Sequence, residues 1–86
     1  MFHTYILECA DGSLYTGWTN DIENRVVAHN IGKGSKYTRT RLPVEVVASW
    51  DFESKSEAMS WEYRIKRMTK SMKLNLIAER KLQKSH

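Results

Sequence analysis

The fold is decided by residues 3–18, which read HTYILECADGSLYTGW. Two runs rich in aromatic and β-branched residues, 3–9 and 14–18, are separated by a short segment that contains Asp11-Gly12. An Asp-Gly pair between such runs is a strong signal for a β-hairpin. The chain is therefore predicted to begin with two antiparallel strands.

The length of the hairpin loop decides which side chains share a face of the sheet. A two-residue loop of Asp11 and Gly12 would place Tyr5 and Tyr15 on opposite faces. A three-residue loop over 10–12 would pair Tyr5 with Gly17, and both phenols would then lie on one face as diagonal neighbours. The sequence leaves both alternatives open.

A helix is predicted after the hairpin. It is expected to begin near Asp21, with Asn20 as its N-cap and Glu23 in the capping-box position. Gly32 or Gly34 is expected to end it, because glycine readily takes the left-handed conformation that follows many helices.

A basic, hydroxyl-rich loop is expected over 35–42, followed by a third strand over 44–52. The strand is predicted from apolar residues at alternate positions, because successive side chains of a strand point to opposite faces. These residues are Val44, Val46, Ala48, Trp50 and Phe52.

One or two helices complete the chain. Ser54 is the expected N-cap, with Glu57 in the capping-box position, and the break between the helices is placed at Lys70-Ser71. The residues expected to face the core at helical spacing are Ala58, Trp61, Ile65 and Met68, continued by Leu74, Ile77, Ala78 and Leu82. Together these elements predict an α+β fold with a small three-stranded antiparallel sheet, as a single domain over 1–86.

The composition is typical of a small intracellular domain. The 86 residues include one cysteine, Cys9, so no disulfide can form within the chain, which suits a reducing compartment. The N-terminal residues show no signal-peptide pattern, and no apolar stretch is long enough to span a membrane. The expected localisation is cytoplasmic.

The charge distribution favours a polyanionic partner. The chain carries 14 Lys and Arg against 10 Asp and Glu, and the excess is clustered. Basic clusters attract nucleic acid through Coulomb steering and counterion release, although a basic surface can also be idle. One cluster is Lys33, Lys36, Arg39 and Arg41, and the other is Arg64, Lys66, Arg67, Lys70, Lys73, Arg80, Lys81 and Lys84.

Several common site types are excluded by the sequence. It has no paired Cys or His at zinc-finger spacing, no glycine-rich phosphate loop after a strand, and no nucleophile elbow. A different set of polar residues remains as candidates for chemistry: Tyr5, Tyr15, Arg25, His29, Lys36, Tyr37 and Glu62.

These residue types suit phosphodiester hydrolysis. Arg25 offers a planar, permanently charged fork for phosphate oxygens, and His29, four residues later, can accept a proton near neutral pH. A lone carboxylate such as Glu62 can hold one divalent ion together with water. Each residue also has a purely structural interpretation: the tyrosines can be packing residues of strands, and Glu62 can pair with Lys66.

Taken together, the candidates resemble the GIY-YIG nuclease family, and specifically its small stand-alone members of the UPF0213 type. The first family signature corresponds to His3-Thr4-Tyr5, without its glycine and isoleucine, and the second to Tyr15-Thr16-Gly17. Further matches are Arg25 on the first helix, His29 one turn later, the loop Gly32–Thr38, and Glu62 on the helix that begins after Ser54.

The resemblance implies a metal-dependent endonuclease site. Tyr5, with Tyr15 or His29, would activate the attacking water, and Arg25 would hold the scissile phosphate. Glu62 would bind one Mg²⁺ or Mn²⁺ ion, and Asn75 is the candidate for the late asparagine of the family. The expected substrate is nucleic acid, with DNA expected ahead of RNA. The residues expected to bind its backbone are Lys36, Tyr37, Arg39, Lys66, Arg67 and Lys70.

Two other functions remain as alternatives. The same scaffold could be a non-catalytic nucleic-acid-binding module, which would bind in a salt-sensitive way and be indifferent to Glu62. It could also be a protein-interaction domain that uses Trp18 or Trp50 as exposed anchors. Because larger members of the family choose their DNA sites with separate domains, a partner protein that supplies specificity is also conceivable.

Overall fold

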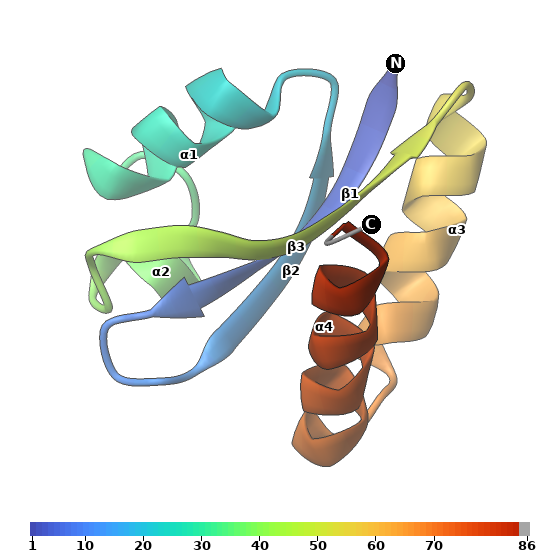
Figure 1. The fold of residues 1–86 in the computed structure, drawn as a ribbon. Coiled ribbons are helices and arrows are strands. Elements are labelled where there is room, and N and C mark those ends of the chain that lie inside the picture. The colour runs from blue at the N-terminus through green and yellow to red at the C-terminus, as the bar shows by residue number, and fades with distance from the viewer. Residues whose placement is uncertain (85–86) are drawn as a thin grey trace.

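The computed structural model describes residues 1–84, and the side chains of 1–83, so the last residues of the predicted domain, Ser85 and His86, and the Lys84 side chain lie outside the described residues. A central sheet is covered on both faces by helices (Figure 1). In chain order the elements are β1 (Phe2–Cys9), β2 (Leu14–Thr19), α1 (Ile22–Asn30), α2 (Lys36–Arg39), β3 (Val44–Phe52), α3 (Lys55–Lys66) and α4 (Lys70–Lys84).

The sheet is three-stranded and antiparallel, as the sequence predicts, and its strand order is β2-β1-β3. The hairpin uses the three-residue loop: the Cys9 amide donates to the Ser13 carbonyl at 2.9 Å, and Gly12 has φ +82°. Tyr5 is therefore the partner of Gly17 across the two strands. This register puts both hairpin tyrosines on the same face.

The predicted alternation of β3 is wrong at Val46. A β-bulge interrupts the pairing of β1 with β3, so that Leu7 pairs with Val46 while its neighbour Ile6 pairs with Ala48. The additional residue, Val47, packs partly buried against the core, and Val46 is exposed. A bulge changes which side chains point inward beyond it, and simple alternation in the sequence cannot indicate it.

The helix boundaries follow from capping hydrogen bonds. The N-cap of α1 is Asp21 and not Asn20, because the Asp21 carboxylate accepts from the Asn24 amide. The helix ends before Gly32, whose φ is +84°, as expected. The segment expected as a loop contains the one-turn helix α2, capped by Ser35.

The two C-terminal helices are separated at 67–69 and not at Lys70-Ser71. The Thr69 hydroxyl accepts from the Met72 amide at 3.2 Å, so Lys70 already belongs to the first turn of α4. Ser54 caps α3 as predicted: its hydroxyl accepts from the Glu57 amide and donates to the Glu57 carboxylate.

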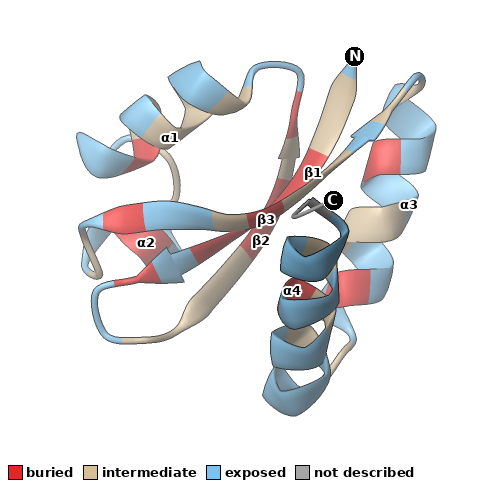
Figure 2. Ribbon diagram, in the orientation of Figure 1, coloured by how far each residue is buried: buried red, intermediate tan, exposed pale blue. Residues whose placement is uncertain are grey.

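Two hydrophobic clusters lie on the two faces of the sheet. One gathers Tyr5, Leu7, Cys9 and Val44, with Val26 of α1 packed against it. The other gathers Ile6, Ala48, Ile65 and Ile77 beneath α3 and α4. Figure 2 shows the resulting pattern, with buried residues along the strands and on one side of α3.

The predicted apolar stripe of α4 is only partly correct. Ile77 is buried and Leu76 packs beside it, but Leu74, Ala78 and Leu82 are exposed. The helix contacts the sheet through β3, at the edge of the sheet, so only a narrow part of its surface is covered.

Candidate active site

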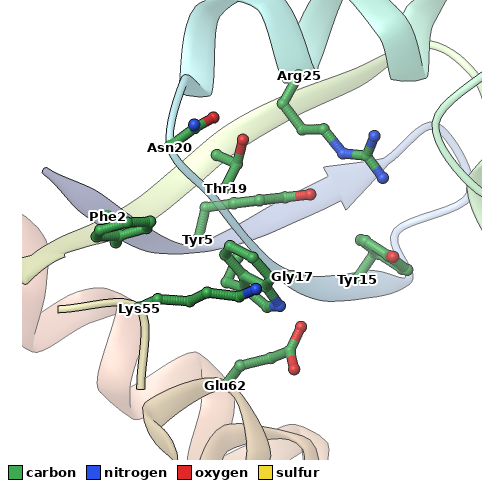
Figure 3. Close-up of a pocket in the computed structure, with 10 residues that line it drawn as sticks. Phe2, Tyr5, Tyr15, Gly17, Thr19, Asn20, Arg25, Lys55 and Glu62 are labelled. Carbon is green, nitrogen blue, oxygen red and sulfur yellow. The ribbon is translucent and has the colours of Figure 1, made fainter. Parts of the chain in front are cut away.

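A cleft of about 550 Å³ opens between the hairpin, the start of α1 and α3. It brings together four candidates that come from distant parts of the sequence (Figure 3). Arg25 enters from α1 and Glu62 from α3, while the two hairpin tyrosines lie between them. The complete lining is Phe2, Tyr5, Tyr15, Gly17, Trp18, Thr19, Asn20, Arg25, Lys55 and Glu62.

Tyr5 lies across Gly17, its cross-strand partner. A Cβ atom on residue 17 would stand 2.5 Å from the phenol oxygen of Tyr5 and 2.7 Å from its Cζ atom. Real Cβ atoms essentially never come so close to another heavy atom, so only glycine allows this position of the phenol. The Tyr5 side chain is consequently almost completely buried and reaches the cleft with its hydroxyl end.

His29 is fully buried and does not line the cleft. The sequence places it beside Arg25 on one face of α1, but its ring lies behind the tyrosines. Its Nε2 atom is 3.1 Å from the Tyr5 hydroxyl, and its Nδ1 atom is 2.8 Å from the Thr38 hydroxyl. The ring of Tyr15 packs against it, with the centroids 5.2 Å apart. His29 can therefore reach a substrate only through Tyr5.

Burial keeps both members of this pair neutral. It raises the pKa of Tyr5; a hydrogen bond from Arg25 and the positive charge of that residue act in the opposite direction, and Tyr15 raises the pKa further. Burial also lowers the pKa of His29, and the positive charge of Arg25 adds to that effect. At neutral pH the Tyr5 phenol is protonated and the His29 imidazole is uncharged.

Arg25 is held at the opposite side of the cleft from Glu62. One of its terminal nitrogens donates to the Gly34 carbonyl at 3.0 Å, which leaves the rest of the guanidinium fork toward the cleft. Residue 34 must be glycine here, because a Cβ atom would overlap the His29 ring. The arginine is thus positioned to bind an anion between itself and Tyr5.

Glu62 is the carboxylate of the cleft. Its side chain is 19% exposed, and one carboxylate oxygen lies 3.6 Å from the Lys66 ammonium group. Glu62 therefore forms the predicted ion pair with Lys66 and also lines the cleft. Among the described residues, no three His, Cys, Asp or Glu side chains gather at one point. A metal ion at Glu62 would therefore be held by one carboxylate and waters, a donor set that suits Mg²⁺ or Mn²⁺.

None of the predicted nucleic-acid-binding residues lines the cleft. Lys36 and Arg39 are exposed on α2, and Lys66 and Arg67 are exposed at the end of α3. The set is completed by Tyr37, whose ring stacks on Tyr15 at 6.0 Å, and by Lys70, which donates to the Gly12 carbonyl. Asn75 is not brought to the cleft, because it is exposed on α4 and lines a separate groove.

Sequence reasoning did not identify several residues of the cleft. Lys55, the first residue of α3, lines it with its ammonium group 5.1 Å from the Trp18 ring centre, but nothing distinguishes it from other lysines in the sequence. Trp18 and Trp50 are half-buried, Trp18 in the lining of the cleft and Trp50 against Trp61, so neither is fully exposed as the protein-interaction alternative expects. Thr38 could have been suspected from one feature of the sequence, its position at the end of the loop Gly32–Thr38 that resembles the family.

The chain belongs to the GIY-YIG family, which is of the nuclease type: the family model for the GIY-YIG catalytic domain matches residues 1–75. Within this family it is similar to small proteins named UPF0213. One from Clostridium perfringens is 51% identical over the whole chain and 92% of the relative. Another, from Halobacterium salinarum, is 52% identical over 85% of the chain and 95% of the relative.

Solved structures support the same assignment. The solution structure of a UPF0213 protein from Bacillus halodurans is 51% identical and matches with a TM-score of 0.59, covering 91% of this chain and 84% of the other. That of a protein from E. faecalis is 38% identical, with a TM-score of 0.63, covering 93% and 85%. In the described part of the chain, no helix is long and apolar enough to cross a membrane.

Proposed function

We propose that this protein is a metal-dependent nuclease that hydrolyses phosphodiester bonds in nucleic acid, with DNA as the first substrate to test. The observation that carries the proposal is the meeting of two phenols, a guanidinium and a carboxylate in one cleft. Membership of the GIY-YIG family supports it from an independent direction. Neither basic charge nor the fold alone would favour hydrolysis over binding.

Arg25 would bind the scissile phosphate and stabilise the charge that develops on its oxygens. Tyr5, at the border between the cleft and the interior, would accept a proton from the attacking water while its own proton passes to Nε2 of His29, 3.1 Å away. This route avoids a resting tyrosinate, which the raised pKa of Tyr5 disfavours. Tyr15 would complete the wall of the cleft beside them.

Glu62 would hold a single Mg²⁺ or Mn²⁺ ion, whose charge would stabilise the leaving oxygen when bound. The half-buried position of the carboxylate supports this role, since it limits competition from bulk water. Lys36, Arg39, Lys66, Arg67 and Lys70 would bind the backbone on both sides of the cleft, and a partner protein could add sequence or structure specificity.

The test is cleavage of DNA and RNA by the purified chain with Mg²⁺ or Mn²⁺, on duplex, branched and single-stranded substrates. Glu62→Gln and Arg25→Ala are expected to reduce cleavage by about a hundredfold or more, the usual effect of removing a group that stabilises the transition state. Glu79→Gln is the matched control, because Glu79 is exposed on α4 and lines a different groove.

Two outcomes would contradict the proposal. Absence of metal-dependent cleavage on every substrate, together with salt-sensitive binding that Glu62→Gln leaves intact, would favour the non-catalytic binding module. Equal cleavage by the wild-type chain and Glu62→Gln would assign the activity to a contaminant or to another site.

A further inference from the structure

Thr38 connects the short helix α2 to the buried side of the candidate active site. Its side chain is fully buried, although the helix that carries it has only four residues and is otherwise largely exposed. The hydroxyl lies 2.8 Å from Nδ1 of His29 and 3.0 Å from the hydroxyl of Ser35, the N-cap of α2. It is also 3.4 Å from the Ser35 carbonyl.

The hydrogen-bond directions in this chain of groups can be assigned from chemistry. A phenol is a better donor than an imidazole N–H, and a bare imidazole nitrogen is a better acceptor than a phenol oxygen, so Tyr5 should donate to Nε2 of His29. A neutral imidazole has only one N–H group, which must then be on Nδ1. Thr38 can accept that hydrogen, because its own hydroxyl hydrogen has the Ser35 carbonyl as an acceptor.

We propose that Thr38 is a positioning residue that holds His29 in the Nδ1–H tautomer and thereby turns the hydroxyl hydrogen of Tyr5 away from the cleft. The proposal rests on the proposed function and deepens it. Thr38 is fully buried and does not line the cleft, so it is a positioning residue and not a catalytic one. It acts through His29, much as second-shell partners orient the histidines of other sites.

The consequence for Tyr5 is that both lone pairs of its oxygen stay available on the side away from His29: the Arg25 guanidinium donates to one, and the other can accept a hydrogen from the cleft. A water molecule there can donate to the phenol oxygen, which is the arrangement that proton removal requires. As the water oxygen attacks phosphorus, its proton forms a bond to the phenol oxygen, and the phenol proton moves to Nε2 of His29. The product is a neutral Tyr5 and an imidazolium whose Nδ1–H group remains bonded to Thr38. In the opposite tautomer Nε2 already carries a hydrogen and cannot take a second proton.

Nitrogen-15 NMR of the full chain measures the tautomer directly, without reference to cleavage. In the wild-type protein, Nδ1 of His29 is expected to show the pyrrole-type shift of a protonated nitrogen and Nε2 the pyridine-type shift. Thr38→Val keeps the shape of the side chain but removes the hydroxyl, and should move the Nδ1 shift toward the pyridine type. Thr38→Ser should restore the wild-type shifts.

The same variants separate positioning from packing in the cleavage assay. Thr38→Val should lower kcat by about tenfold to a hundredfold, as second-shell changes do, with little change in KM. Thr38→Ser should recover most of the activity. Thr40→Val is the matched control, because Thr40 is exposed at the end of α2, and it should leave both the NMR shifts and kcat unchanged.

A wild-type His29 with its hydrogen on Nε2 would overturn the proposal, and this measurement does not depend on the folding of any variant. Unchanged shifts in Thr38→Val would also overturn it, as would an equal change in Thr40→Val. These NMR readouts are independent of cleavage. A wild-type protein that cleaves no substrate but shows the expected tautomer would therefore contradict the proposed nuclease activity, and would leave the control of the His29 tautomer by Thr38 intact.

Discussion

At the scale of single residues, the cleft requires glycine at two positions, because any side chain there would collide with a ring of the site. Gly17 and Gly34 each leave room for a ring of the site, the first for Tyr5 and the second for His29. Neither glycine has a positive φ, so it is close approach and not backbone conformation that requires them. The site is therefore sensitive to the smallest possible increase in side-chain size.

Gly17→Ala is expected to displace the Tyr5 phenol, because the new Cβ atom would lie 2.5 Å from its oxygen. Overpacking of this kind costs about 1–3 kcal/mol of the free energy of unfolding. Cleavage should fall about a hundredfold, as misplacement of a reacting group by about 1 Å can do. Urea unfolding and the cleavage assay measure the two effects.

A second substitution provides the control for this steric explanation. Tyr5→Leu removes both the oxygen and the Cζ atom that the new Cβ meets, so Gly17→Ala should destabilise the Tyr5→Leu protein less than it destabilises the wild type. If Gly17→Ala has the stability and activity of the wild type, the close approach of Tyr5 to residue 17 has no functional importance.

The stability of the protein should depend on pH through His29. The group is faced by Tyr5, Tyr15 and Arg25, and burial together with the positive charge of Arg25 lowers its pKa in the folded state. Below a pH of about 6.5 the unfolded chain binds a proton at His29 that the folded chain does not. The free energy of unfolding should therefore fall as the pH is lowered from about 7 to 5.

This dependence is measured by urea unfolding across that pH range. His29→Asn removes the titrating group, so the remaining dependence should be weaker than in the wild type. Identical pH profiles for the two proteins would show that His29 protonation is not linked to folding.

At the scale of elements, three of the helices present groups to the cleft or support groups that line it. Helix α1 carries both Arg25 and the buried His29, and α3 carries Glu62 one turn before its end. The short helix α2 supports both tyrosines from behind: Thr38 through His29, and Tyr37 by stacking on Tyr15. Arg41 lies 4.0 Å above the Tyr37 ring and bonds to Asp11, which ties α2 to the hairpin loop.

Ser54→Ala is expected to lower the free energy of unfolding by about 1 kcal/mol, because the N-cap of α3 loses its bond to the Glu57 amide. Chemical denaturation measures this change. Ser60→Ala is the matched control in the exposed middle of the same helix, where alanine should be neutral or slightly stabilising. Equal stability of the two variants would contradict the assigned cap.

At the scale of the whole molecule, the sheet separates two cores, while the cleft lies where the hairpin, α1 and α3 meet. The exposed basic residues of α2 and of the α3–α4 junction lie outside that cleft. Lys70 reaches the hairpin loop and bonds to the Gly12 carbonyl, so the second group is adjacent to the hairpin that supplies the tyrosines.

Neutralising Arg67 and Lys70 should weaken binding to DNA and make it less sensitive to salt. Each phosphate contact adds about 0.9 to the slope of the logarithm of affinity against the logarithm of salt concentration, so Arg67→Gln with Lys70→Gln should reduce that slope by about 2. Fluorescence anisotropy over a salt series measures it. Lys81→Gln, on a different groove, should leave the slope unchanged, and an unaltered slope in the double variant would remove these residues from the interface.

Most strands and helices of this protein, although not the short helix α2, could be predicted from the sequence, because their signals are local. The Asp-Gly hairpin, the Ser54 cap and the strand over 44–52 each depend on residues within a few positions of one another. Residue type and a family resemblance were enough to select the candidates Tyr5, Tyr15, Arg25 and Glu62. They did not predict how far apart these side chains lie in the folded protein.

Tertiary structure alone decided what depends on long-range contact. The three-residue loop is one of two local alternatives that only the structure distinguishes, whereas the bulge at Val47 and the burial of His29 follow from packing between segments that are separate in the sequence. The same is true of Thr38, whose role arises from one 2.8 Å contact with a ring nine residues away. No local pattern specifies such contacts, because they form only when the sheet and helices bury their apolar faces together.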